Sequence, residues 1–280
     1  MVIDVLYDTC IDGIRLLPFL FLTYLAMECM EHWTGEKMRK VIGRSGKAGP
    51  AIGSFLGIFP QCGFSAAAAN LYAGRIITTG TLIAVFLSTS DEMLPVMLSE
   101  NVGASMIAKI LFLKVCFALA AGFLVDFAFR KKEEPQIEHF CERHHCHCEK
   151  GILASAVNHT WRIFLYILVV SFALNFVIAL IGEEALAAII LDKPFLGLFV
   201  AALVGMIPNC ASSVILTQLY LENVLGAGAL MAGLLSGSGV GFLVLLGVND
   251  DRKDNLRIFA LLYGFGVAAG ALVEMLGVVF

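Results

Sequence analysis

Charged residues are scarce in this chain of 280 residues. Asp, Glu, Lys and Arg make up 15% of it, whereas soluble domains carry about 25%. Hydrophobic residues reach 59%, and the mean hydropathy is +0.86. A soluble fold of this size cannot bury so much apolar surface, because surface area shrinks too slowly with chain length. The composition therefore excludes a soluble domain and predicts a polytopic membrane protein.

Other features that the sequence lacks argue against several classes of protein. The formal net charge is −4, so the basic excess typical of a nucleic-acid-binding protein is missing. The sequence has no Gly-x-x-x-x-Gly-Lys loop, which argues against an ATP-driven motor. It has no His-Glu-x-x-His or Gly-x-Ser-x-Gly motif, which argues against an enzyme. The alternation of a β-barrel is also lacking, so the apolar runs predict helices.

The apolar runs differ in length. A membrane crossing needs about 20 residues. Five runs approach or exceed this length: 14–31, 104–129, 161–182, 227–248 and 256–280. The run at 76–90 does so only if it continues past Asp91 and Glu92. We therefore predict six crossings.

Two runs, 48–59 and 62–74, are too short to cross. Twelve helical residues extend about 18 Å, whereas the hydrocarbon core is about 30 Å thick. Pro60 and Gly63 lie at their junction, where proline ends a helix and glycine permits a turn. These features predict a re-entrant hairpin made of two half-helices.

The sequence repeats itself at an offset of 148 residues. Segment 57–62, Gly-Ile-Phe-Pro-Gln-Cys, falls on 205–210, Gly-Met-Ile-Pro-Asn-Cys. The register continues without a gap until Asp126 meets Glu274. Such self-similarity predicts two copies of one structural unit.

The basic residues predict the topology. Placing the loops 36–47, 130–132 and 252–257 in the cytoplasm satisfies the positive-inside rule and puts both termini outside. Each copy then has three crossings, and an odd number inverts one copy relative to the other, as in many secondary transporters.

The predicted fold is thus an all-α polytopic protein of the cytoplasmic (inner) membrane, with about ten helical segments in two inverted repeats. Each repeat has three crossings and one re-entrant helix hairpin. We expect residues 1–129 to form the first membrane repeat, 130–158 a cytoplasmic His/Cys-rich linker and 159–280 the second membrane repeat.

The two proline motifs are the first candidate site. Irregular backbone survives in a membrane only where it is buried or lines a cavity. Each motif carries a carboxamide, a thiol and a nearby hydroxyl: Gln61, Cys62 and Ser65 in the first copy, Asn209, Cys210 and Ser213 in the second. Paired thiolates suit soft metals and metalloids. Alternatively, these cysteines pack inertly between helices.

The second candidate site is the polar segment that contains Ser88, Asp91 and Glu92, with Ser236 at the equivalent position of Ser88. Acidic residues within a membrane segment are costly and usually functional, so they could bind a cation or relay protons. Alternatively, Asp91 and Glu92 lie at the outer end of the segment and are solvated. Lys114 lies well within the run 104–129 and aligns with Leu262 in the other copy. A single charged residue of this kind is weaker evidence for function.

The linker is the third candidate site. Its ligand-type residues are His139, Cys141, His144, His145, Cys146, His147 and Cys148. This density favours metal binding, although the spacing does not match a closed zinc finger, so metal loading or sensing fits better. The alternative is a polar tract with incidental His and Cys.

The proline motifs, the segment Ser-Thr-Ser-Asp-Glu-x-Leu-Pro and the His/Cys linker resemble the ten-transmembrane heavy-metal (arsenic-type) exporters, whose members are also labelled manganese transporters. The chain is also distantly similar to organoarsenical permeases. The resemblance implies ten segments, which agrees with five apolar runs per copy. Cys62 and Cys210 would suit arsenite or a soft cation, whereas Asp91 and Glu92 would suit manganese.

We therefore expect a secondary transporter that exports a heavy-metal ion or metalloid, with no permanently bound cofactor. Its partners would be the lipid bilayer and the transition-metal ion or metalloid that it carries, without ATP or nucleic acid; a homo-oligomer is left open. The alternative is a permease for a small organic or oxyanion solute on the same scaffold.

Overall fold

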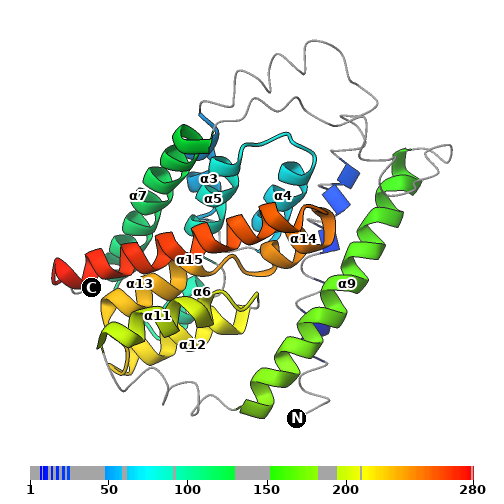
Figure 1. The fold of residues 1–280 in the computed structure, drawn as a ribbon. Coiled ribbons are helices and arrows are strands. Elements are labelled where there is room, and N and C mark those ends of the chain that lie inside the picture. The colour runs from blue at the N-terminus through cyan, green and yellow to red at the C-terminus, as the bar shows by residue number, and fades with distance from the viewer. Residues whose placement is uncertain are drawn as a thin grey trace.

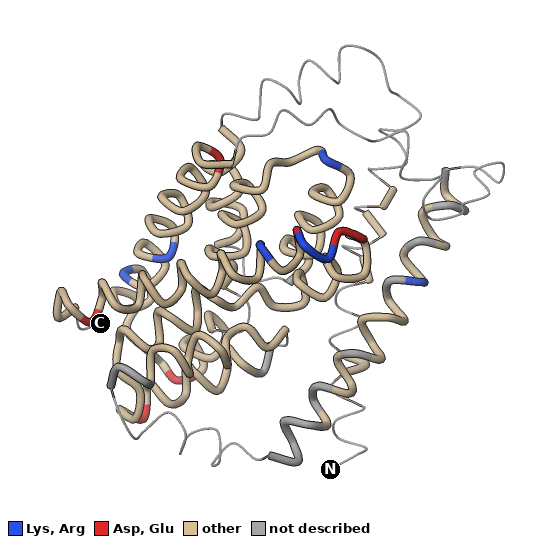
Figure 2. The backbone as a smooth tube through the Cα atoms, viewed as in Figure 1, with Lys and Arg blue, Asp and Glu red and all other residues tan. Residues whose placement is uncertain are grey.

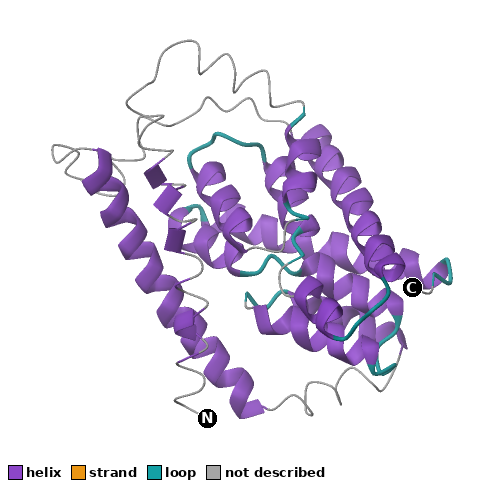
Figure 3. Ribbon diagram, turned by 180° about the vertical axis from the view of Figure 1, so that it is seen from behind, coloured by secondary structure: helices purple, strands orange, loops and turns teal. Residues whose placement is uncertain are grey.

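The structure is a computed structural model that describes residues 48–58, 62–90, 93–129, 152–181, 194–208, 210–278 and 280, with scattered positions between 7 and 25. Every element in these ranges is a helix (Figure 3). The all-α prediction is confirmed for this part of the chain. The linker residues 130–151 lie outside it, and helix α9 (Ile152–Ile181) begins before the predicted end of the linker.

Apart from α9, the helices in the described ranges fall into two sets that follow one another in the chain (Figure 1). The first set consists of α3 (Gly49–Leu56), α4 (Cys62–Ala73), α5 (Thr79–Ser88), α6 (Met93–Ser99) and α7 (Ala104–Phe129). The second set consists of α11 (Pro194–Gly205), α12 (Cys210–Leu221), α13 (Ala227–Ser236), α14 (Val240–Val248) and α15 (Arg252–Met275). Helix α9 lies along one side of the bundle, where it contacts α14.

Among the residues that the structure describes, five apolar helical stretches are long enough to cross a membrane. They are Thr79–Ser99, Ala104–Phe129, Ala156–Ala173, Ala227–Val248 and Arg252–Met275. Lys, Arg, Asp and Glu are sparse among the described residues (Figure 2). On α7, Phe112 and Phe127 are 68% and 91% exposed, as expected of side chains that face lipid tails. The structure therefore agrees with a multi-pass membrane protein, although the predicted crossing at 14–31 lies largely outside the described residues.

The two helix sets correspond closely in their bounds. Helices α4 and α12 differ by 148 residues at both ends, and so do α5 and α13. Their contacts also correspond, because α5 packs on α3 and α7, while α13 packs on α11 and α15. Across the sets, α4 packs on α14 and α12 packs on α6. Contacts between the short helices and the opposite set thus hold the two sets together.

Helices α5 and α13 form the centre of the bundle, and small residues let their neighbours approach closely. A Cβ added to Gly122 of α7 would lie 2.8 Å from the carbonyl oxygen of Gly80 in α5. A Cβ added to Gly228 of α13 would lie 2.6 Å from that of Gly270 in α15. Such distances are too short for any side chain, so glycine permits the backbone packing that is typical of membrane helices.

A carboxylate from a neighbouring helix accepts hydrogen bonds at the start of each central helix, α5 and α13. Asp126 accepts hydrogen bonds from the Gly80 backbone N–H, at 2.9 Å, and from the Thr78 hydroxyl, at 2.8 Å. Glu274 accepts one from the Gly228 N–H, at 3.2 Å. Backbone N–H groups at a helix start have no partner within the helix, and a negative charge is favoured there. Both acidic residues therefore stabilise helix starts.

We expect Asp126→Ala to destabilise the protein by about 2 kcal/mol, because hydrogen bonds to a charged group contribute roughly 1.5–3 kcal/mol. Glu274→Ala should destabilise the protein less than Asp126→Ala does, because the exposed Glu274 side chain makes a single, longer hydrogen bond to the helix start. Thermal unfolding of the purified variants in detergent measures both effects. Equal losses would contradict this assignment.

Candidate functional site

The first central helix is interrupted inside its apolar stretch. Helix α5 ends at Ser88, and α6 begins at Met93. The Ser88 hydroxyl donates to the carbonyl oxygen of Ala84, at 2.8 Å, and the Thr89 hydroxyl donates to that of Val85, at 2.7 Å. The carbonyl groups at the helix end find other donors: the Ser90 hydroxyl donates to the carbonyl oxygen of Ser88 at 3.2 Å, and the Thr89 backbone N–H donates to that of Phe86 at 3.3 Å. These bonds explain how the break persists in a buried place.

The second central helix is interrupted at the equivalent position. Helix α13 ends at Ser236, whose hydroxyl donates to the carbonyl oxygen of Ala232 at 2.8 Å. The chain then runs through Gly237, Ser238 and Gly239 before α14 begins. Gly239 has φ 52° and ψ −145°, a conformation that only glycine adopts without strain. The buried Ser238 hydroxyl has no hydrogen-bond partner within the described part of the chain.

Lys114 reaches the first interruption from α7. Its side chain is 1% exposed, and its Nζ donates a hydrogen bond to the carbonyl oxygen of Thr89, the residue that follows α5. An ammonium group is costly to bury in a membrane unless it is paired, and helix C-terminal carbonyls carry partial negative charge. The equivalent residue of the second set, Leu262, is buried and uncharged. At this repeat-equivalent position, a charged residue is therefore present in the first helix set and absent from the second.

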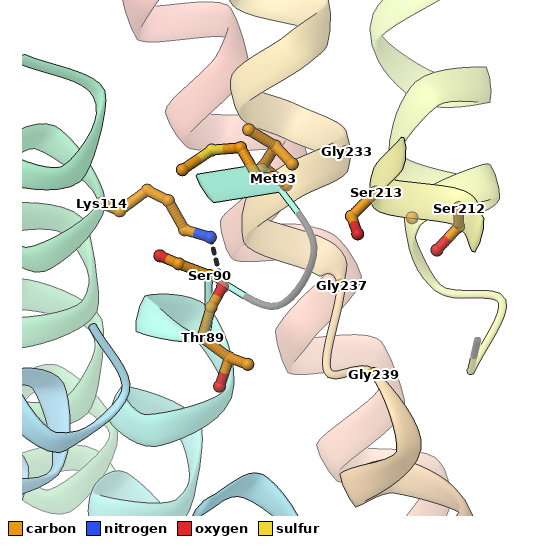
Figure 4. A pocket seen from close by; sticks show the side chains of 11 residues that line it. Thr89, Ser90, Met93, Lys114, Ser212, Ser213, Gly233, Gly237 and Gly239 are labelled. Carbon is orange, nitrogen blue, oxygen red and sulfur yellow. Dashed lines mark hydrogen bonds between the residues drawn. The ribbon is translucent and has the colours of Figure 1, made fainter. Parts of the chain in front are cut away.

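A small cavity lies between the two interruptions, with room for about one water-sized sphere. Figure 4 shows Lys114 and Ser90 on one side of it and Ser213 on the other. Its lining residues are Thr89, Ser90, Met93 and Lys114 from the first set, and Gly205, Ser212, Ser213, Gly233, Leu234, Gly237 and Gly239 from the second. Among these residues only Lys114 is charged.

Helix ends of both polarities border the cavity. The C-terminal ends of α5 and α11 contribute Thr89 and Gly205, and the N-terminal end of α12 contributes Ser212 and Ser213. Helix dipoles therefore do not select one sign of charge here.

The predicted serines occupy different places. Ser213 lines the cavity, whereas Ser88 and Ser236 are buried at the ends of α5 and α13 without lining it. Ser65 is buried against α14, where a Cβ added to Gly241 would lie 2.6 Å from its Cβ. The structure thus brings Ser213 to the cavity, while its counterpart Ser65 packs between helices.

Several predicted ligands lie outside the described residues or side chains. Cys62 and Cys210 begin α4 and α12, but their side chains are not described. The residues that lie wholly outside are Gln61, Asp91, Glu92 and Asn209, together with the linker residues His139, Cys141, His144, His145, Cys146, His147 and Cys148. In the described ranges, no three His, Cys, Asp or Glu side chains are placed to hold a metal ion.

Sequence reasoning undervalued Lys114 and missed Met93 and Ser212 as lining residues, whereas Thr89 and Ser90 belong to the polar segment that it singled out. One signal was present for Lys114, which is a charged residue in the middle of a long apolar run with leucine at the repeat-equivalent position. No comparable signal distinguishes Met93 from a core methionine.

Comparison with known proteins agrees with this architecture. The family model described as "Putative, 10TM heavy-metal exporter" matches residues 2–187, which include α3 to α9 and end before α11. No curated protein and no solved structure matches the chain. Because the family match covers more than half of the sequence, this chain belongs to the ten-transmembrane heavy-metal exporter family.

Proposed function

We propose that this protein is a secondary transporter that exports a heavy-metal ion or a metalloid through the cavity between the two interrupted helices. The observation that carries the proposal is the meeting of α5–α6 and α13–α14 at a small cavity whose lining includes four hydroxyl residues, Thr89, Ser90, Ser212 and Ser213, together with Lys114. Transporters place substrate sites where discontinuous helices meet near the middle of the membrane.

The 148-residue correspondence of helix bounds supports a transport cycle based on two inverted copies. In this proposal the basic loops are cytoplasmic, the termini are outside and the chain lies in the inner membrane. The two proline motifs form re-entrant hairpins whose tips approach the cavity. The His/Cys linker then binds metal on the cytoplasmic side, where it loads or senses the cargo.

Two ligand sets define the alternative cargoes. Cys62 and Cys210 would bind arsenite or a soft cation through sulfur, with Gln61 and Asn209 as neighbouring oxygen donors. Asp91 and Glu92 would bind manganese through oxygen, since hard cations prefer carboxylates. The positions of Ser90 and Ser213 on the cavity support either set, because each adds a hydroxyl.

The test is elemental analysis of cells that lack their own efflux systems, with and without this protein. We expect lower arsenic or manganese content when the protein is present. Cys62→Ser with Cys210→Ser should abolish arsenic export and spare manganese export, whereas Asp91→Asn with Glu92→Gln should do the reverse. Matched controls are Cys116→Ser and Glu100→Gln, since both residues are exposed. Unchanged content of every metal would contradict export.

A permease for a small organic or oxyanion solute is the second candidate. One observation favours it, namely that the one charged residue among the described lining residues is the cationic Lys114. Uptake of arsenate or phosphate, with no change in cellular metal content, would support this alternative.

A further inference from the structure

We propose that Tyr72, Arg75 and Asp254 form a gate, closed in this structure, between the cavity and the end of the molecule at which α15 begins. This inference rests on the proposed function and deepens it, since it names the contact that must break before cargo reaches the cavity from that end. Transport by alternating access moves one repeat against the other, so a bond that joins the two helix sets at one end must open there during the cycle.

The gate is a contact between the two helix sets at one carboxylate oxygen. The Tyr72 hydroxyl, near the end of α4, donates a hydrogen bond to Asp254 Oδ2 in the first turn of α15, at 2.7 Å. Arg75 Nη1 lies 4.0 Å from the same oxygen, and its guanidinium lies over the Tyr72 ring, 5.5 Å from the centroid. Asn249, which follows α14, donates to that oxygen at 3.1 Å. Asp254 therefore holds the two sets together at this point, where Tyr72 is only 2% exposed.

The gate lies at the ends of α5 and α14 that are remote from the cavity. Helix α5 begins at Thr79, whose hydroxyl is 3.3 Å from that of Tyr72, and ends at Ser88 beside the first interruption. Helix α14 begins after the cavity-lining residue Gly239 and ends next to Asn249. Between these ends α4 packs along α14 (Figure 1). The ten residues of α5 extend about 15 Å, so the gate lies about one helix length from the cavity, towards one end of the molecule.

The backbone at Arg75 gives no reason for an arginine. Arg75 has a positive φ of 58°, and the repeat-equivalent residue Asn223 has a φ of 60°. Asparagine tolerates this left-handed conformation better than arginine does, because its short polar side chain can bond locally. What arginine adds is a guanidinium group beside Asp254 and Tyr72. Its side chain, rather than its backbone preference, therefore explains its place at the gate.

The second helix set has no equivalent charged contact among its described residues. The counterpart of Asp254 is the uncharged Met106. The counterpart of Tyr72 is Tyr220, which bonds to the backbone of Phe280 and lies edge-on to its ring, with centroids 6.2 Å apart, so that it contacts its own set. The carboxylates that stabilise the starts of α5 and α13, by contrast, occur in both copies. A contact that is confined to one end of the molecule is suited to closing that end alone.

The experiment measures access to the cavity from each face of the membrane. Gly237→Cys is the reporter, because Gly237 lines the cavity and the nearest atom to its added Cβ is 3.4 Å away. A membrane-impermeant maleimide is added to right-side-out and to inside-out vesicles that contain the full-length protein. Mass spectrometry separates labelling of residue 237 from that of the native cysteines. The exposed residue Lys253, substituted as Lys253→Cys, identifies the vesicles whose outer surface is the gate face.

We expect Tyr72→Phe to accelerate labelling of residue 237 from the gate face about tenfold, the factor that corresponds to one lost hydrogen bond to a charged group. Asp254→Asn should have an effect of similar size, because Arg75 loses its ionic partner and Tyr72 its charged acceptor. Tyr220→Phe is the matched control and should leave the labelling rate unchanged, since it removes a bond within one set. Labelling from the opposite face should not increase in any variant.

Unchanged labelling from the gate face in both gate variants would overturn the inference, even if their thermal stability falls, because the contact would then only stabilise the fold. An equal increase in Tyr220→Phe, or an increase from both faces, would overturn it as well. If neither gate variant folds, the reporter alone decides: labelling of residue 237 from the gate face as fast as that of Lys253→Cys would show that no gate is closed. Because labelling requires no cargo, the proposed function fails separately, when the wild type changes the cellular content of no metal.

Discussion

Replacing Gly205 with alanine is expected to destabilise this protein by about 2 kcal/mol or more. A Cβ at this position would lie 2.8 Å from the carbonyl carbon of Gly233 and closer still to its oxygen. Because the obstacle is backbone in the middle of α13, it cannot rotate away as a side chain could. Overpacking of this kind typically costs 1–3 kcal/mol even where the neighbours can adjust.

Gly264→Ala is the matched control for this prediction. Gly264 lies within α15, and no heavy atom would lie within 4 Å of its added Cβ. Alanine is favoured over glycine inside a helix by about 1 kcal/mol, so the control should raise thermal stability slightly. Thermal unfolding of both variants in one detergent gives the comparison. If Gly205→Ala unfolds at the wild-type temperature, α11 and α13 are not packed as described.

Replacing Gly237 with leucine is expected to lower the transport rate at least about tenfold while the protein remains folded. Gly237 lines the cavity, its φ of −69° suits any residue, and the nearest atom to an added Cβ is 3.4 Å away. The Cβ of a leucine would therefore fit at this position, and the rest of the side chain would compete with a cargo for the cavity. A cavity with room for about one water-sized sphere cannot hold both leucine and a cargo.

Two comparisons separate plugging of the cavity from unfolding. Gly103→Leu adds the same side chain where no heavy atom lies within 4 Å, so it should transport normally. Gly237→Ala adds one methyl group and should retain a measurable rate. Metal efflux from loaded cells, together with thermal stability of the purified proteins, provides the readout. Normal transport by a folded Gly237→Leu would show that the cargo does not pass through this cavity.

Helix lengths could be predicted because lipid imposes a simple rule. Backbone N–H and C=O groups that face lipid must bond within their own segment, so a long apolar run that faces lipid is helical, whereas the run 227–248 breaks between α13 and α14 because it is buried in the bundle. The run 104–129 accordingly matches α7, Ala104–Phe129, at both ends. The 148-residue repeat likewise predicted that equivalent segments would form equivalent helices, as the matching bounds of α4 and α12 illustrate.

The interruptions and the cavity were decided by the tertiary structure. Thr89 and Lys114 are 25 residues apart in sequence, and only the packing of α7 on α5 brings the ammonium to the carbonyl oxygen. Ser65 and Ser213 occupy equivalent positions in the two copies, yet one packs against α14 and the other lines the cavity. The sequence by itself determined that apolar helices span a membrane in two related sets, because hydropathy acts locally along the chain. Which polar groups meet depends on how one set packs against the other, and that arrangement is a property of the whole fold.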